Sequence, residues 1–206
     1  MDIAFLITAF ATLFVVMDPI GLTPLFVALT QGADQAHRRS VAIRACLTGA
    51  GVLFVFTLFG EAVLGFIGIS MSAFRIAGGI LLLLTALDML FERRTKRRED
   101  KVEELPDPSI FPLATPLIAG PGAIASMILL MGQTNSILDA AALIGVMLSV
   151  IITLYLFLLS GSQFERLLGR NGINVVTRLL GMLLAALAVQ FVIDGLLSVN
   201  WSAMAG

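Results

Sequence analysis

Six apolar segments, each close to the roughly 20 residues that a helix needs to cross a bilayer, decide what this chain of 206 residues can fold into. The chain is 58% hydrophobic and 13% charged, whereas soluble domains are usually about 25% charged. Within lipid the backbone must satisfy its own hydrogen bonds, so these segments are expected to be helices. We predict an all-α membrane protein, one membrane domain over 1–206, with helices over about 3–30, 42–60, 72–91, 110–132, 138–160 and 176–197.

The lysines and arginines predict how the chain crosses the membrane. With six spans, Arg75 alone falls on one side. The positive-inside rule places the other side in the cytoplasm, and therefore both termini outside it. The first segment follows Met1–Asp2 rather than a basic stretch, so we expect a retained helix and not a signal peptide. The cytoplasmic residues would be Arg38, Arg39, Arg44, Arg93, Arg94, Lys96, Arg97, Arg98, Lys101, Arg166, Arg170 and Arg178.

Two of the apolar segments contain proline and glycine at matching places. The first is cut at Asp18-Pro19-Ile20-Gly21 and the fourth at Ala119-Gly120-Pro121-Gly122, with Thr115-Pro116 before it. A proline inside a helix removes a hydrogen-bond donor and clashes with the preceding turn. We therefore expect the first and fourth helices to be broken near the middle of the membrane.

The spacing of these markers indicates an internal duplication. Pro19 and Pro121 lie 102 residues apart, and Arg75 and Arg178 lie 103 apart. The predicted repeats cover about 1–91 and 110–197, joined by a cytoplasmic linker over about 92–109. Three spans per repeat is an odd number, so the two repeats must have opposite orientations. Helices broken at corresponding places in inverted repeats indicate a transport site.

Asp18 is the ionisable residue at the first break. A carboxylate near mid-membrane is costly and marks a functional site by default. It has two interpretations, which are compatible. Asp18 binds a cation, the amino group of a substrate or a coupling proton, or it bonds to the unwound backbone and stabilises the break.

The second break carries no charge, but it begins a half-helix whose N-terminus can hold a carboxylate. The half-helix that begins near Gly21 offers the same chemistry, and Thr23 adds a hydroxyl. A zwitterion with few other polar atoms would suit this combination. Gln190 in the last segment is expected near mid-membrane, more typically as an interhelical partner than as a ligand contact. The candidate substrate- or ion-binding residues are Asp18, Pro19, Gly21, Thr23, Thr115, Gly120, Pro121, Gly122, Ser126 and Gln190.

The two broken segments carry a family resemblance. Asp18-Pro19-Ile20-Gly21 with Thr23-Pro24, and Ala114-Thr115-Pro116 through Gly120-Pro121-Gly122, resemble the two signature segments of the MarC family, also called UPF0056 or SnatA-like. The resemblance covers essentially the whole chain. It implies six helices with an inverted repeat, a place in the bacterial inner membrane, and a link to the transport of small molecules such as neutral amino acids, coupled to ions or protons.

From the residues and the resemblance we expect a secondary transporter of small solutes, with a proton or sodium ion as coupling ion, and not an enzyme. Its partners would be membrane lipid and the solute; no cofactor, metal or nucleic acid is expected, and the small size is compatible with a homo-oligomer. The alternative is a non-transporting membrane scaffold or regulatory subunit that acts through the polar loop 92–108. That loop contains a basic cluster typical of lipid or partner binding, although it also fits a plain topology signal. An intramembrane enzyme and a channel are less favoured.

Overall fold

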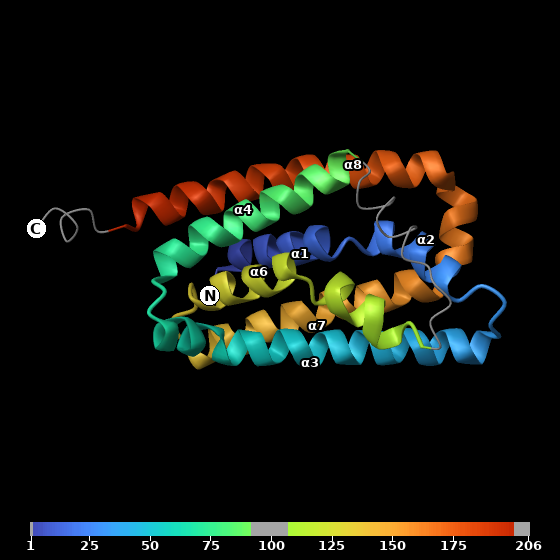
Figure 1. Ribbon diagram of the computed structural model, residues 1–206, viewed down its shortest axis with the longest axis horizontal. Helices are drawn as coiled ribbons and strands as arrows, with labels where there is room; N and C mark the ends of the chain where they lie inside the picture. The colour runs from blue at the N-terminus through green and yellow to red at the C-terminus, as the bar shows by residue number, and fades with distance from the viewer. Residues whose placement is uncertain (1, 92–106, 200–206) are drawn as a thin grey trace, which may run out of the picture.

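The computed structural model describes residues 2–91 and 107–199, and the regular secondary structure in these ranges is helical (Figure 1). This confirms the all-helical class. The expected linker lies mostly outside the described residues. The first half forms α1 (Ile3–Met17), α2 (Pro19–Leu29), α3 (Gln35–Ile67) and α4 (Met71–Leu90), and the second half forms the π-helical segment η1 (Ser109–Ile118), α6 (Pro121–Met131), α7 (Ile137–Leu159) and α8 (Gly161–Leu197).

The described helices provide five segments that are long and apolar enough to cross a membrane. The first of them is Ile3–Leu29, so α1 and α2 together form one candidate span. A sixth arises if η1 and α6, which are bent by 51° relative to each other, count as one span. The number of spans therefore agrees with the sequence prediction.

Two helices are longer than the sequence predicted. α3 has 33 residues instead of the predicted 42–60, because Asp34 accepts a hydrogen bond from His37 N at 2.7 Å and starts the helix before the apolar run begins. It ends at Gly68, whose φ of 82° suits glycine. α8 begins at Gly161 and bends at Gly169, so its membrane-length part is Asn171–Leu197. In both cases the helix begins in a stretch that contains arginines, before the apolar run that was used to predict it.

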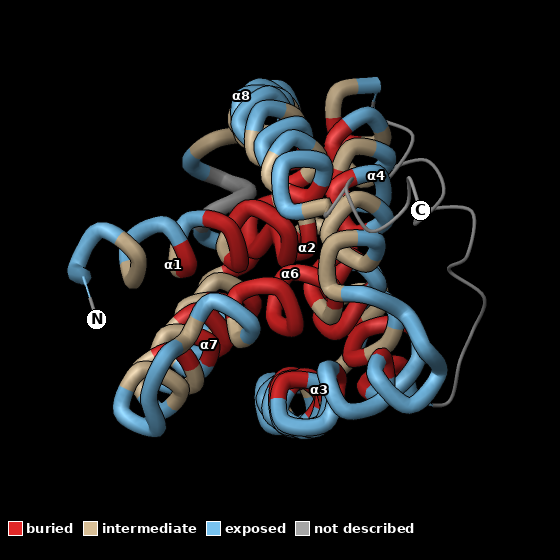
Figure 2. The backbone as a smooth tube through the Cα atoms, turned by 90° about the vertical axis from the view of Figure 1, so that its left-hand side faces the viewer, coloured by how far each residue is buried: buried red, intermediate tan, exposed pale blue. Residues whose placement is uncertain are grey.

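The halves interlock instead of forming separate bundles. α3 packs against η1 and α6 of the second half, and α7 packs against α1 and α2 of the first. In the same way α4 contacts α6, and α8 contacts α1 and α2. Figure 2 shows α2 and α6 as largely buried segments near the middle, with the long helices around them.

α4 and α8 form the closest helix pair, and small residues make this approach feasible. A methyl group added at Gly79 of α4 would lie 2.8 Å from the backbone oxygen of Ala188 and 2.7 Å from Val192 Cγ2 of α8. One added at Gly181 would lie 3.0 Å from Met89 Cβ of α4. Van der Waals packing over small residues is the typical way in which helices associate in lipid.

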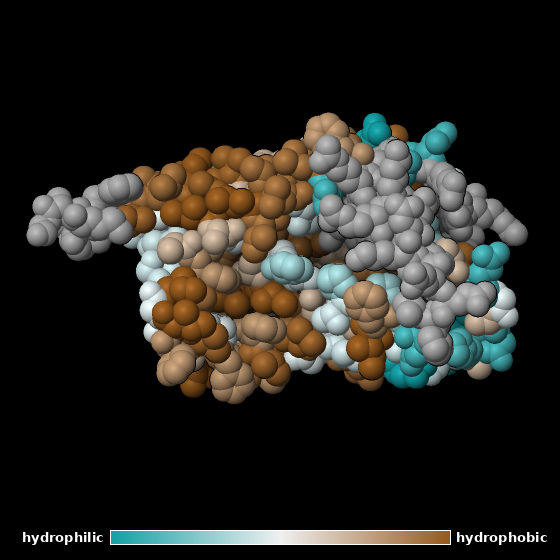
Figure 3. Space-filling view, in the orientation of Figure 1, coloured by the Kyte–Doolittle hydropathy of each residue, from teal (hydrophilic) through white to brown (hydrophobic). Residues whose placement is uncertain are grey.

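The outer surface is apolar over most of the length of the molecule. Large side chains in the middle of the candidate spans are exposed, among them Leu47, Phe59 and Ile152. Figure 3 shows apolar side chains gathered over the part of the molecule away from the start of α3, and hydrophilic ones at the end where α3 begins. Because a soluble protein would bury such residues, this surface fits contact with lipid tails.

Candidate functional site

The first interruption is confined to one residue. α1 ends at Met17, Asp18 has a left-handed backbone (φ 52°), and α2 begins at Pro19. Pro19 has no N–H to offer the Val15 carbonyl, and the N–H of Gly21 goes to Asp18 Oδ1 at 3.0 Å instead of to the Met17 carbonyl. The interruption therefore removes the regular helical donors from carbonyls at the end of α1.

Asp18 acts as the N-cap of α2. It is only 1% exposed, and its carboxylate satisfies one of the amide groups that a helix N-terminus leaves unpaired. Proline in the first helical position follows the usual preference. Gly21 is needed here, because a Cβ on this residue would overlap the Asp18 carboxylate. The structure thus contains the bond of the second interpretation of Asp18, in which its carboxylate bonds to the backbone at the break. The two interpretations are compatible.

The second interruption is longer and is built from prolines. Phe111 and Thr115 have extended backbones within η1 (φ −127° and −129°), because each precedes a proline. The chain then turns at Ala119 and Gly120, and α6 starts at Pro121. A Cβ on Gly120 would collide with the backbone oxygen of Pro116, so this turn requires glycine. The N-cap residue of α6 is Gly120, which has no side chain to cap the helix.

The two interruptions lie next to each other. A methyl group added at Gly122, in the first turn of α6, would lie 3.2 Å from Val16 Cγ1 near the end of α1. It would also lie 3.3 Å from Leu82 Cδ2 and 3.5 Å from Thr85 Oγ1, both on α4. Gly122 is buried. Segments about 100 residues apart in the sequence therefore meet in the interior of the molecule, and α4 joins them there.

Three buried hydroxyls accompany the interruptions. Thr23 Oγ1 donates to the Pro19 backbone oxygen at 2.8 Å, so its hydroxyl has a hydrogen-bond partner within α2. Within residues 2–91 and 107–199, the hydroxyl of Ser126, fully buried on α6, has no hydrogen-bond partner, and neither does that of Thr12, which is 1% exposed on α1. Unsatisfied buried hydroxyls are uncommon and call for an explanation, such as a ligand or an ordered water.

The candidate residues do not all come together. Asp18, Pro19, Thr23, Gly120, Gly122 and Ser126 are buried, while Gly21 and Thr115 are half-buried and Pro121 is exposed.

Gln190 is exposed on α8, and its amide donates to Asp194 Oδ1 of the same helix at 2.8 Å, so the bond that the structure gives it lies within one helix instead of between two. The face of α8 that packs on α4 carries Gly181 and Ala188, and Gln190 lies off that face.

Sequence reasoning missed Thr12 and Thr85. Thr85 is the one hydroxyl residue between Ile80 and Leu87, and Thr12 precedes Asp18 by less than two helical turns. Their hydroxyl chemistry was the available signal. Their position beside the interruptions depends on tertiary packing, which the pattern of one helix does not contain.

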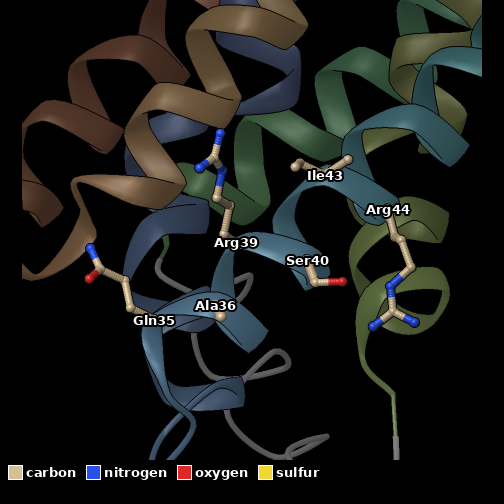
Figure 4. Close-up of a pocket in the computed structure, with 6 residues that line it drawn as sticks. All are labelled: Gln35, Ala36, Arg39, Ser40, Ile43 and Arg44. Atoms are coloured by element: carbon tan, nitrogen blue, oxygen red, sulfur yellow. The ribbon is translucent and has the colours of Figure 1, made fainter.

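Two cavities lie at the hydrophilic end of the molecule rather than at the interruptions. One, of about 620 Å³, runs along the start of α3 and is shown in Figure 4. The other, of about 420 Å³, lies between α2, the start of α3 and the end of α7. Among the described residues, the lining of both includes Gln35 and Arg39.

An ion pair joins the two halves near these cavities. Arg44 Nη1 of α3 lies 2.8 Å from Asp107 Oδ2, just before η1. Hydrogen bonding by Ser109, whose backbone N–H donates to Asp107 Oδ1 at 3.0 Å, and then the Arg44 guanidinium hold the pKa of Asp107 below its usual range. The pair is exposed, so its contribution to stability is small.

Comparison with known proteins gives a consistent result over the whole chain. Residues 3–199 match the model of the MarC family, described as integral membrane proteins. A UPF0056 membrane protein of Methanocaldococcus jannaschii is 40% identical over 95% of this chain and 98% of its own. The UPF0056 inner membrane protein YhgN of Escherichia coli is 34% identical over 93% of this chain and 95% of its own. No solved structure matches. The chain belongs to the MarC family of integral membrane proteins.

Proposed function

We propose that the chain is a secondary transporter of a small zwitterion such as a neutral amino acid, coupled to a proton or a sodium ion. The observation that carries this proposal is the unequal capping of α2 and α6. Both helices begin with a proline at matching places in the two halves, yet the N-cap residue of α2 is Asp18, whose carboxylate caps the helix, and that of α6 is Gly120, which has no side chain to do so. A substrate carboxylate would supply to α6 what Asp18 supplies to α2.

The chemistry on both sides of the site suits a zwitterion. The N-terminus of α6 offers backbone N–H groups and the positive end of a helix dipole to the carboxylate. Asp18 and the carbonyls at the end of α1 offer negative charge and acceptors to the ammonium group. Val16 packs on Gly122, so these two surfaces adjoin each other. Ser126, whose hydroxyl has no partner among the described residues, adds a hydrogen-bonding group on α6.

The packing supports two inverted repeats. Matching α1, α2, α3 and α4 with η1, α6, α7 and α8 pairs several contacts with a counterpart: α7 with α1 and α2 corresponds to α3 with η1 and α6. The α8–α2 contact likewise corresponds to the α4–α6 contact. α4 and α8 run antiparallel, since Gly79 faces Val192 while Gly181 faces Met89. Two repeats that move against each other would open the site alternately to either side.

The proposal includes an orientation in the membrane, which follows from the positive-inside rule. Arg38, Arg39 and Arg44 would lie in the cytoplasm and both termini outside it, in the inner membrane of a bacterium. The relative YhgN is named an inner membrane protein. In this account the substrate crosses unchanged, without enzymatic chemistry. The burial of Asp18 and Gly122 corresponds to a closed state, from which one repeat must move to admit substrate.

The direct test is uptake by the purified protein in liposomes. Labelled glycine, alanine and serine are offered with and without a pH gradient or a sodium gradient, and uptake of at least one is expected to depend on a gradient. A variant with a shortened 92–106 segment separates transport from the scaffold alternative. A transporter should keep its gradient-driven uptake after the shortening. A scaffold that acts through this segment would show no uptake of any of the three amino acids, with or without the shortening.

A further inference from the structure

A second, unrelated site lies at the hydrophilic end of the molecule, where two adjoining cavities combine arginines with an apolar wall. The 420 Å³ cavity is lined by Phe26, Val27, Ala33, Gln35, Arg38, Arg39, Leu158 and Leu159. The 620 Å³ cavity continues along α3 past Gln35 and Arg39. Volumes of this size fall in the range of small-molecule sites.

One of the arginines is held in place and the other is available. Arg38 Nε donates to Thr30 Oγ1 at 3.0 Å, and the Thr30 hydroxyl donates to the Phe26 backbone oxygen at 2.7 Å. This chain of bonds fixes the guanidinium at the rim of the cavity. In the part of the chain that the structure describes, Arg39 forms no ion pair.

Figure 4 shows that Arg39 and Arg44, the two arginines that line the larger cavity, extend in different directions. Arg39 extends from α3 toward the neighbouring helices, away from the side on which Arg44 extends. Arg44 already has Asp107 as its partner. The nearest acid in sequence, Asp34, uses its carboxylate to cap α3 through His37 N. Two guanidinium groups at the start of a helix therefore face the smaller cavity, whose described lining contains no acid.

The apolar part of the cavity continues toward the lipid-facing surface. Phe26 and Leu158 are each 2% exposed and form a firm wall, while Leu159 is 43% exposed. Leu159 is also the last residue of the candidate span Ile137–Leu159. The cavity therefore stands where the apolar surface of the molecule gives way to the hydrophilic one, at the expected height of lipid headgroups.

We propose that this cavity binds an anionic phospholipid. The phosphate would accept hydrogen bonds from Arg38 and Arg39, which match phosphate geometry through their planar forks. The first part of an acyl chain would lie along Phe26, Leu158 and Leu159. Basic pockets between helices on the cytoplasmic side are a recurring mode of lipid recognition. This site does not depend on the transport proposal, because none of its residues lies at the interruptions.

Native mass spectrometry of the full chain, delipidated in detergent, tests this. Dioleoylphosphatidylglycerol should be retained in preference to dioleoylphosphatidylcholine, and Arg39→Gln should weaken its retention about tenfold, as for the loss of a charge-assisted hydrogen bond. Arg39→Lys should keep part of the binding as a point charge. Leu159→Ser should also weaken it, without disturbing the core.

Arg178→Gln is the matched control, since Arg178 is exposed, lies outside the lining of both cavities and loses the same charge. It should leave retention unchanged. Equal retention of the two lipids, or an equal loss in Arg178→Gln and Arg39→Gln, would overturn the proposal. Displacement of the lipid by an equal concentration of inorganic phosphate would identify a free-anion site instead and would equally overturn it.

Discussion

Gly122 lies against Val16, so close that a methyl group added to it would come within 3.2 Å of Val16 Cγ1. This contact joins the start of α6 to the end of α1, and it is the structural basis for treating the two interruptions as one site. Leu82 and Thr85 close the same space from α4. Changes at this point should therefore affect stability and transport together.

Gly122→Ala should lower the stability of the protein by about 1–3 kcal/mol, because the added methyl group overpacks a closed contact, and it should also reduce uptake. Gly145→Ala is the matched control, since nothing lies within 4 Å of a methyl group there. That substitution should be neutral or slightly stabilising. The chain's single cysteine, Cys46, is 5% exposed, so its labelling by a thiol-reactive dye reports unfolding on heating. Equal melting temperatures for the two variants would contradict the packing described.

Ser126→Ala should separate binding from stability. The Ser126 hydroxyl is buried and has no partner in the part of the chain that the structure describes. Its removal should therefore leave the free energy of unfolding unchanged or raise it by up to about 1 kcal/mol, and the melting temperature should not fall. If the hydroxyl contacts the substrate, the KM of uptake should rise several-fold. In the control Ser149→Ala, the hydroxyl lost is one that donates to Val146 O within α7 at 2.6 Å. An unchanged KM in Ser126→Ala would exclude Ser126 from the site.

The Arg44–Asp107 pair should contribute little to the stability of the fold at neutral pH. Asp107→Asn and Arg44→Gln are each expected to cost less than about 1 kcal/mol, with a coupling energy in the same range. The folded pKa of Asp107 is lowered, so its contribution is complete above the unfolded pKa of about 4 and is lost as the pH falls through the folded value. Thermal unfolding followed by circular dichroism at pH 7 and pH 3 checks this. A variant that stayed less stable than the parent to the same degree at both values would contradict the assignment.

The sequence predicts most of what local chemistry decides. Pro19 and Pro121 begin helices in the structure because proline suits the first helical position, and Asp18 caps α2 because its short carboxylate reaches a nearby amide. The apolar runs likewise predicted the number of candidate spans. These features depend on residues within a few positions of each other, so one sequence suffices to find them.

Features that depend on which helix faces which were harder to predict. Gln190 was expected at the site, but α8 turns its small residues toward α4 and leaves Gln190 exposed. Gly181, Ala188 and Gly195 recur every seven residues, which was an available signal for the packed face. The cavity beside Arg39 could not be predicted, because its wall comes from α2, α3 and α7 together. The arginines there were interpreted only as a topology signal.

Asp18→Asn gives the most direct test of the transport account. The asparagine side chain keeps an oxygen that can accept the Gly21 N–H, so folding should be preserved while the negative charge is lost. Asp88→Asn, which removes the charge of a half-buried aspartate of α4, is the control. The measurement is gradient-driven uptake of the best substrate by each variant in liposomes. The account predicts at least a tenfold loss for Asp18→Asn with normal melting, and near-normal uptake for Asp88→Asn; uptake by Asp18→Asn at the parental rate, still driven by the gradient, would contradict it.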